Sequence, residues 1–229
     1  MEYVYILFLL AEVIFAYFYI TKGCLLTKML ASVPFVTAGV YLTLFCEPSH
    51  TVYAWLVVAG LGFSFLGDWV LKYDLFGMKG LPGIASFALA HILYISAFAV
   101  RIPLTLKDLW LILPWAVMIV LEIIAKYRMK IDLGAAAPAV LIYAMIIDAM
   151  VLLGVRAAAL SINGGSSVLR AVILIFGVIM FIISDAGVCL MMFGGRTDIK
   201  LGRKTYKLDP INIVMYNGGQ MLISASVLL

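Results

Sequence analysis

The chain has 229 residues, of which 66% are hydrophobic and only 12% are charged, and its formal net charge is +4. A soluble domain is usually about half apolar and about a quarter charged. A soluble fold of this size could not bury so much apolar surface, so the composition excludes a water-soluble globular protein and favours a membrane protein.

Long apolar runs follow one another along the chain and predict an all-α, polytopic bundle of eight transmembrane helices within a single domain, 1–229. About 20 apolar residues span a bilayer as a helix, whereas β-barrel strands are short and alternating. The first run lacks the basic start and the cleavage site of a signal peptide, so we expect it to be retained. The sixth run is the weakest, because it contains Asp148. The predicted helices cover 3–20, 24–44, 51–71, 81–100, 108–126, 135–156, 168–193 and 210–229.

Lysine and arginine are distributed unequally between the two sets of predicted loops. With eight helices, one set carries Lys22, Lys72, Lys79, Lys126, Arg128, Lys130, Arg196, Lys200, Arg203, Lys204 and Lys207. The other set carries Arg101, Lys107 and, at its margins, Arg156 and Arg170. Basic loops are generally cytoplasmic, so the first set is predicted to face the cytoplasm and both termini the opposite side.

Two short segments suggest an internal repeat of four helices in parallel orientation. Gly67-Asp68 near the end of the third run is followed by Phe76-Gly77, and Ser184-Asp185 in the seventh run is followed at the same offsets by Phe193-Gly194. The match is short, and an origin by chance is the alternative interpretation.

Ionisable residues at membrane depth are the informative ones, because each costs roughly 2.5–3.5 kcal/mol at a helix centre and therefore faces the bundle interior. Asp68 and Asp185 are predicted at similar depth near the cytoplasmic ends of their helices. Two nearby carboxylates in a low dielectric cannot both ionise easily, which leaves an acid beside a base. The alternative is a structural helix-packing pair bound to Lys28. The full set at membrane depth is Glu12, Lys28, Asp68, His91, Glu122, Asp148 and Asp185.

Two further pairs of polar residues have helical spacing. His91 and Tyr94 are three residues apart, and Tyr216 and Gln220 are four apart, so each pair shares one helix face. A structural, hydrogen-bonded role for His91 is the alternative to a catalytic one. Glu122 lies near a predicted helix end and can reach water, whereas no motif surrounds Glu12 or Asp148.

Several familiar chemistries have no support in the sequence. Zinc hydrolysis needs three or four ligands at fixed spacing, but the chain has two histidines, and His50 is predicted on the opposite side from the aspartates. The three cysteines form no CxxC pair, and we interpret them as small apolar residues that fill space between helices. No GxSxG, Walker or GxGxxG element is present. We therefore expect neither a metal nor a cofactor.

Four segments in order along the chain resemble the YhhN family of membrane proteins, which includes the lysoplasmalogenases. Lys28 and Tyr143 also match a lysine in the second helix and a tyrosine in the sixth helix of that family. The resemblance covers essentially the whole chain with eight helices. The matching segments are GDWVL at 67–71, FALAHILYISAF at 87–98, FIISD at 181–185 and YNGGQMLI at 216–223.

The resemblance implies hydrolysis of the vinyl-ether bond of a lysoplasmalogen to a fatty aldehyde and a glycerophospho-base. Such a bond is cleaved by protonating its β carbon and adding water to the resulting oxocarbenium ion, which requires an acid, a stabilising anion and a base. Glycosidases meet a related need with two carboxylates. Asp68 and Asp185 are then the expected acid and base, in either order, with His91 and Tyr94 as catalytic partners. The residues expected to bind substrate are Lys28, Tyr143, Tyr216 and Gln220.

Three alternatives remain open at this point. A transporter of lipids or small molecules also uses repeats and intramembrane acids, a hydrolase of another lysolipid would share the same site, and a scaffold would show no turnover. The expected partners are a lysophospholipid and membrane lipid, with no nucleic acid. The expected location is the cytoplasmic membrane of a bacterium or the endoplasmic reticulum of a eukaryote.

Overall fold

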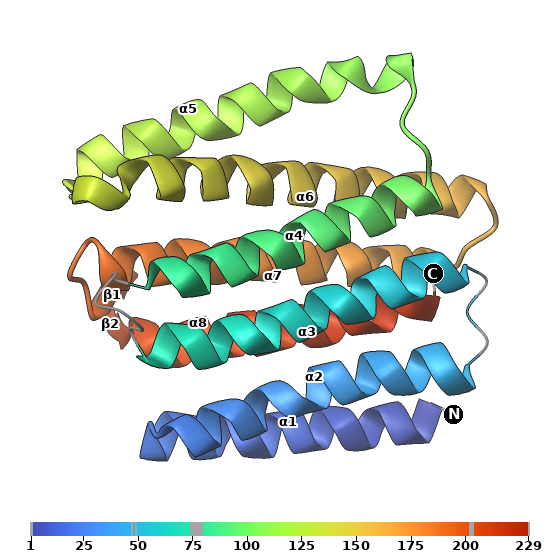
Figure 1. The fold of residues 1–229 in the computed structure, drawn as a ribbon, viewed down its shortest axis with the longest axis horizontal. Helices are drawn as coiled ribbons and strands as arrows, with labels where there is room; N and C mark the ends of the chain where they lie inside the picture. Colours follow the sequence, from blue (N-terminus) through green and yellow to red (C-terminus); the bar gives the residue numbers. More distant parts are fainter. Residues whose placement is uncertain (1, 47, 49, 74–79, 202–203, 229) are drawn as a thin grey trace.

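A computed structural model describes residues 2–46, 48, 50–73, 80–201 and 204–228. These residues form a bundle of α-helices joined by short connections (Figure 1). The helices are α1 (Glu2–Lys22), α2 (Leu25–Phe45), α3 (Thr51–Tyr73), α4 (Leu81–Arg101), α5 (Ile112–Met129), α6 (Ala137–Asn163), α7 (Val168–Met192) and α8 (Leu208–Ala225). The short 3-10 helices are η2 (Leu106–Leu111), η3 (Gly134–Ala136) and η4 (Ser226–Leu228), and the strands are β1 (Asp198–Leu201) and β2 (Lys204–Lys207).

Seven helical segments within the described residues, all but α8, are long and apolar enough to cross a membrane. Unbroken helices satisfy their backbone groups internally, which is the requirement for a segment in lipid. The chain is therefore an integral membrane protein. The helix α8 has 18 residues and carries several polar side chains, among them Asp209, Asn212, Asn217 and Gln220, so it falls short of the hydrophobicity of the others. A count of eight spanning helices stays a prediction, as does the four-helix repeat, for which Phe76-Gly77 lies outside the described residues.

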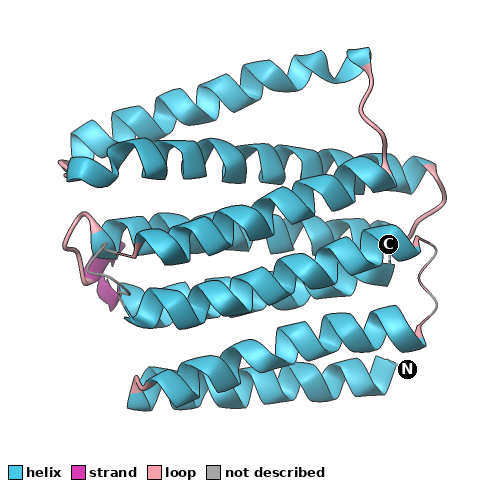
Figure 2. Ribbon diagram, in the orientation of Figure 1, coloured by secondary structure: helices cyan, strands magenta, loops and turns pink. Residues whose placement is uncertain are grey.

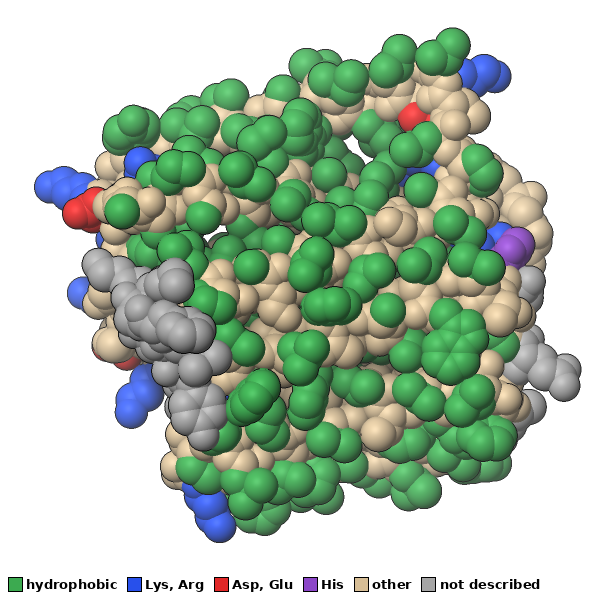
Figure 3. All heavy atoms as spheres, viewed as in Figure 1, with side chains coloured by type: hydrophobic (Ala, Val, Ile, Leu, Met, Phe, Trp, Pro, Cys, Tyr) green, Lys and Arg blue, Asp and Glu red, His purple; other side chains and the backbone are tan. Residues whose placement is uncertain are grey.

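The bundle core is formed by α2, α3, α4, α6, α7 and α8, whereas α1 and α5 lie at its margins (Figure 1). The most extensive helix pairs are α3 with α4 and α7 with α8. Large side chains such as Phe35, Phe98 and Phe181 are buried between the helices. Apolar side chains that point outward cover most of the face seen in Figure 3, as expected for a surface solvated by lipid.

The two ends of the bundle differ in charge, as the loop pattern predicted. The connections α1–α2, α5–α6 and α7–α8 lie at one end, here called the basic end, and both chain termini lie at the other (Figure 1). The hairpin of β1 and β2, which carries Lys200, Lys204 and Lys207, also lies at the basic end (Figure 2). At the opposite end Arg101 Nη1 lies 2.9 Å from His50 Nε2, which confirms that His50 is remote from the aspartates.

Two segments differ from the sequence prediction. The helix α6 was predicted to end at Arg156, but it continues to Asn163 because Arg156 is buried and its charge is compensated. Its Nε lies 2.5 Å from Asp108 Oδ1, and its Nη1 donates to the carbonyl of Ile102. The hairpin was not predicted, since four-residue strands are too short for a clear alternation.

Candidate active site

Asp68 lies on α3 and is held from the side of α2. Lys28 Nζ lies 2.9 Å from Asp68 Oδ1, and the hydroxyl of Ser32 donates to Asp68 Oδ2 at 2.5 Å. Lys28 and Ser32 are one helical turn apart, so both reach the same carboxyl group. Asp68 is only 3% exposed, and a buried charge needs such compensation. An ammonium and a hydroxyl donor supply that compensation.

The ammonium of Lys28 is less enclosed than the carboxylate that it binds. Its Nζ lies 4.7 Å from the centre of the Tyr216 ring and 5.3 Å from that of Tyr19. Aromatic faces stabilise a cation and leave other directions open for a further ligand. The Lys28 side chain is 14% exposed, against 3% for Asp68, so the positive charge is the more accessible member of the pair.

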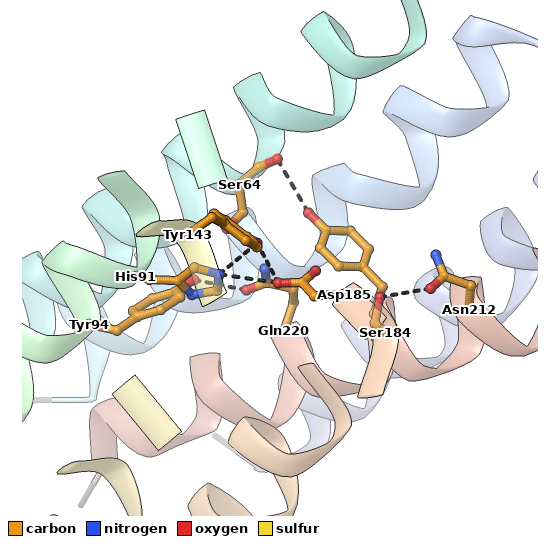
Figure 4. Close-up of polar contacts among 9 residues, drawn as sticks. Ser64, His91, Tyr94, Tyr143, Ser184, Asp185, Asn212 and Gln220 are labelled. Atoms are coloured by element: carbon orange, nitrogen blue, oxygen red, sulfur yellow. Dashed lines mark hydrogen bonds and ion pairs between the residues drawn. The ribbon is translucent and has the colours of Figure 1, made fainter. Parts of the chain in front are cut away.

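Asp185 lies on α7 and has entirely different partners (Figure 4). The hydroxyl of Tyr143, on α6, donates a short hydrogen bond to Asp185 Oδ2. His91 Nε2, on α4, lies 3.2 Å from the same oxygen and 2.9 Å from the Tyr143 hydroxyl. His91 is fully buried, with its ring 4.7 Å from that of Phe181, whereas the Asp185 side chain is 13% exposed. Three helices therefore converge on one carboxyl oxygen.

A second layer of contacts lies behind these groups. The hydroxyl of Tyr94 donates to Gln220 Oε1 at 2.8 Å, which ties α4 to α8. The hydroxyl of Tyr216 donates to the carbonyl of Ser64 at 3.3 Å, which ties α8 to α3. Tyr94 and Gln220 are fully buried. These contacts tie α8 to α3, which carries Asp68, and to α4, which carries His91 (Figure 4).

Asp68 and Asp185 line the same cavity, which has a volume of about 250 Å³. The hydrogen bonds described for the two carboxylates go to different partners, so their role as an acid–base pair stays a prediction. The cavity has an apolar wall as well as polar groups. Its lining residues are Tyr19, Lys28, Asp68, Leu71, Ile84, Phe87, Tyr143, Ser184, Asp185, Val188, Met191, Met192, Asp209, Asn212, Ile213 and Tyr216.

The structure brings the predicted site residues together in two layers. Lys28, Asp68, Tyr143, Asp185 and Tyr216 line the cavity. His91, Tyr94 and Gln220 are not among the lining residues. His91 contacts Asp185 and Tyr143, which do line the cavity, and Tyr94 is hydrogen-bonded to Gln220. Gly67, directly before Asp68, allows α4 to approach α3 closely, because a Cβ at Gly67 would lie 2.8 Å from the ring of Phe87.

The other ionisable residues at membrane depth lie apart from this cavity. Glu12 on α1 and Asp148 on α6 are buried but are not among its lining residues. Glu122 lines a separate groove, described below. Of the two aspartates, Asp68 is the one that forms a buried ion pair with Lys28.

Sequence reasoning missed several residues at the cavity. Ser32 lies four residues after Lys28, and Asn212 lies four residues before Tyr216, so helical spacing from the predicted residues could have found both. Asn212 accepts a hydrogen bond from Ser184 at 3.2 Å. Among the described residues, no group of three histidine, cysteine, aspartate or glutamate side chains is arranged to hold a metal ion.

These features define a helical membrane protein with a polar cavity near one end of its bundle. The chain belongs to the YhhN family, whose model matches residues 25–227. The match covers every helix that contributes to the cavity except α1, which supplies Tyr19. No curated protein matches the sequence, and neither does any solved structure.

Proposed function

We propose that the protein hydrolyses the vinyl-ether bond of lysoplasmalogens, releasing a fatty aldehyde and a glycerophospho-base. The observation that carries this proposal is one membrane-embedded cavity with two carboxyl groups in contrasting environments and an accessible lysine. Family membership supports a hydrolase role, because the YhhN family is associated with lysoplasmalogenase activity.

Asp185 is the proposed proton donor. The enol ether accepts a proton at its β carbon, and Asp185 lines the cavity with its side chain 13% exposed, whereas its partner His91 is fully buried. Tyr143 and His91 both contact Oδ2, so they orient the carboxyl group. A proton lost from Asp185 to the substrate can be restored from the water that adds next.

Asp68 is the proposed stabilising anion. Protonation of the β carbon places a positive charge on the ether oxygen and the α carbon, and a fixed carboxylate lowers the energy of that cation. Lys28 and Ser32 both donate to Asp68 and hold its carboxyl group in place. The same Lys28 ammonium offers a positive charge to the phosphate of the lipid.

The remaining steps balance without any further reactant. Water adds to the α carbon of the oxocarbenium ion and loses a proton to the Asp185 carboxylate. The hemiacetal that results then collapses: its hydroxyl proton leaves and the glycerol oxygen is protonated as the C–O bond breaks. The net reaction consumes one water and yields an aldehyde and an alcohol.

Aldehyde release tests the proposal. Purified protein in detergent is given an alkenyl lysophospholipid, with the saturated alkyl analogue as a control. Aldehyde from the alkenyl lipid alone is expected, and Asp185→Asn is expected to abolish it while the protein still elutes as a folded species. No aldehyde from folded protein would contradict the proposal. Products from other lysolipids would then indicate a different hydrolase, and lipid flux in liposomes without products would indicate a transporter.

A further inference from the structure

A second cavity meets the first one at the proposed proton donor. It is a groove of about 210 Å³ between α5, α6 and α7, and it shares Tyr143 and Asp185 with the polar cavity. It is called the α5–α7 groove below. The two cavities therefore lie on either side of the same pair of side chains.

The α5–α7 groove is almost entirely apolar, whereas the first cavity has more polar groups in its wall. Its two charged residues besides Asp185 are Glu122 and Lys126, which lie one turn apart on α5. The remainder of the wall is aliphatic or contains sulfur. The residues concerned, apart from those already named, are Ile123, Ala125, Met129, Ile131, Leu133, Val140, Leu141, Ala144, Ile147, Ile182, Ala186, Cys189 and Leu190.

One wall of the groove is weakly attached to the bundle. The helix α5 lies at the margin of the molecule, packs mainly against α6 and η2, and has no buried residue along its described length (Figure 1). One side-chain hydrogen bond, from Trp115 Nε1 to the carbonyl of Met145 at 3.0 Å, attaches it to α6. That bond lies in the half of α5 away from the groove, so the groove half can move apart from α7 at little cost.

We propose that the α5–α7 groove binds the single hydrocarbon chain of the lysolipid, which enters sideways from the membrane between α5 and α7. This inference rests on the proposed function. The order of groups along the lipid is phosphate, glycerol, ether and chain. The order along the protein matches it: Lys28 in the polar cavity, Asp185 and Tyr143 at the junction, and the apolar groove beyond.

This placement explains how a bond with no charge of its own is positioned at Asp185. The phosphate is attracted to Lys28 and the chain to the groove, so the vinyl ether between them is drawn to the junction. Binding energy from the two remote parts then orients the reacting bond. Both cavities also lie in the same half of the bundle, so the lipid needs only one leaflet.

A native thiol reports occupancy of the groove without any need for turnover. Cys189 lines the groove and is partly exposed, whereas Cys24 and Cys46 lie outside it. In the Cys24→Ser/Cys46→Ser protein, which keeps Cys189 alone, the rate of modification by N-ethylmaleimide is followed by mass spectrometry. A saturated alkyl-ether lysophosphocholine is added as the probe, and a two-chain phosphatidylcholine at the same concentration is the control.

The alkyl-ether probe is expected to slow modification of Cys189 about ten-fold at ten times its Kd, since that excess leaves roughly a tenth of the sites free. The two-chain lipid is expected to protect much less. The Cys24→Ser/Cys189→Ser protein, which keeps Cys46, should react at the same rate with and without the probe. Equal reactivity of Cys189 with and without the probe would overturn the inference.

A second variant tests the groove through specificity. Ala144→Phe places a ring in the groove, and Ala149→Phe is the matched control, because Ala149 lies on the same helix with similar burial and lines neither cavity. The ratio of kcat/KM for a long-chain over a short-chain alkenyl substrate is expected to fall about ten-fold or more in Ala144→Phe, since each methylene excluded from an apolar site has an effect of that order. An unchanged ratio in folded Ala144→Phe would overturn the inference.

The two readouts separate this inference from the proposed function. Protection of Cys189 without any aldehyde formation would support the chain-binding groove and contradict the vinyl-ether reaction. Aldehyde formation with neither Cys189 protection nor a change in chain-length preference would support the reaction and contradict the groove.

Discussion

At the scale of single residues, the two aspartates show how similar positions acquire different chemistry. Asp68 lies five residues before the end of α3 and Asp185 seven before the end of α7, so each lies about 8–10 Å from its helix end. Depth was therefore predictable from the sequence. The contacts of Asp185 with Tyr143 and His91 were not, because these residues are 42 and 94 residues away along the chain. The difference arises from helix packing, which sequence spacing does not encode.

Tyr143→Phe is expected to lower kcat with little change in KM, because it removes a hydrogen bond to Asp185 and leaves the shape of the cavity intact. Hydrogen bonds to charged groups contribute about 1.5–3 kcal/mol, so a loss of roughly 10- to 100-fold in kcat is expected. Tyr53→Phe is the matched control, since Tyr53 is a buried tyrosine whose hydroxyl donates to Ser226 at 2.7 Å, away from the cavity. Steady-state aldehyde release measures both variants, and equal kcat values would contradict the role of Tyr143.

A double-mutant cycle on Lys28 and Asp68 separates a structural from a functional ion pair. Lys28→Met leaves a buried carboxylate without its cation and is expected to cost about 3–5 kcal/mol of stability. The double variant Lys28→Met/Asp68→Asn is expected to regain much of that stability but no activity. Thermal unfolding in detergent and aldehyde release are measured on the same samples. Recovery of activity in the double variant would mean that the pair only holds α2 to α3.

At the scale of elements, the helices were predictable because long apolar runs leave few alternatives in lipid. The helix boundaries were less predictable. The helix α6 extends past Arg156 because Asp108, 48 residues away along the chain, compensates the charge of Arg156. The polar character of α8 has a similar cause, since Tyr216, Asn217 and Gln220 are buried against other helices instead of facing lipid. Tertiary contacts therefore decide the features that hydropathy alone missed.

The contact between α3 and α4 depends on a glycine at a close approach. A Cβ at Gly60 would lie 2.4 Å from Cε1 of Tyr94, whose hydroxyl is fixed by Gln220. Gly60→Ala is expected to destabilise the protein by about 1–3 kcal/mol and to lower activity by displacing α4, which carries His91. Gly62→Ala is the control in the same helix, because a Cβ there meets nothing within 4 Å. The unfolding midpoint in detergent measures both, and an unchanged midpoint in Gly60→Ala would contradict this tight contact.

At the scale of the whole molecule, the polar cavity, the α5–α7 groove and the basic connections all lie in one half of the bundle (Figure 1). The arrangement gives the cavity a position near one membrane surface instead of a path through the membrane. This placement favours an enzyme that takes its lipid from one leaflet over a transporter. Because basic segments are generally cytoplasmic, we propose that the cavity faces the cytoplasmic leaflet.

The native cysteines allow this orientation to be tested. Cys24, between α1 and α2, lies at the basic end, and Cys46, which follows α2, lies at the opposite end. Variants that keep only one of these thiols are expressed in a bacterial host, and spheroplasts are treated with a membrane-impermeant maleimide. Cys46 is expected to react in intact spheroplasts and Cys24 only after permeabilisation, with labelling in detergent as the control for intrinsic reactivity. The reverse pattern would place the basic end outside, and the lipid would then have to reach Asp185 from the outer leaflet.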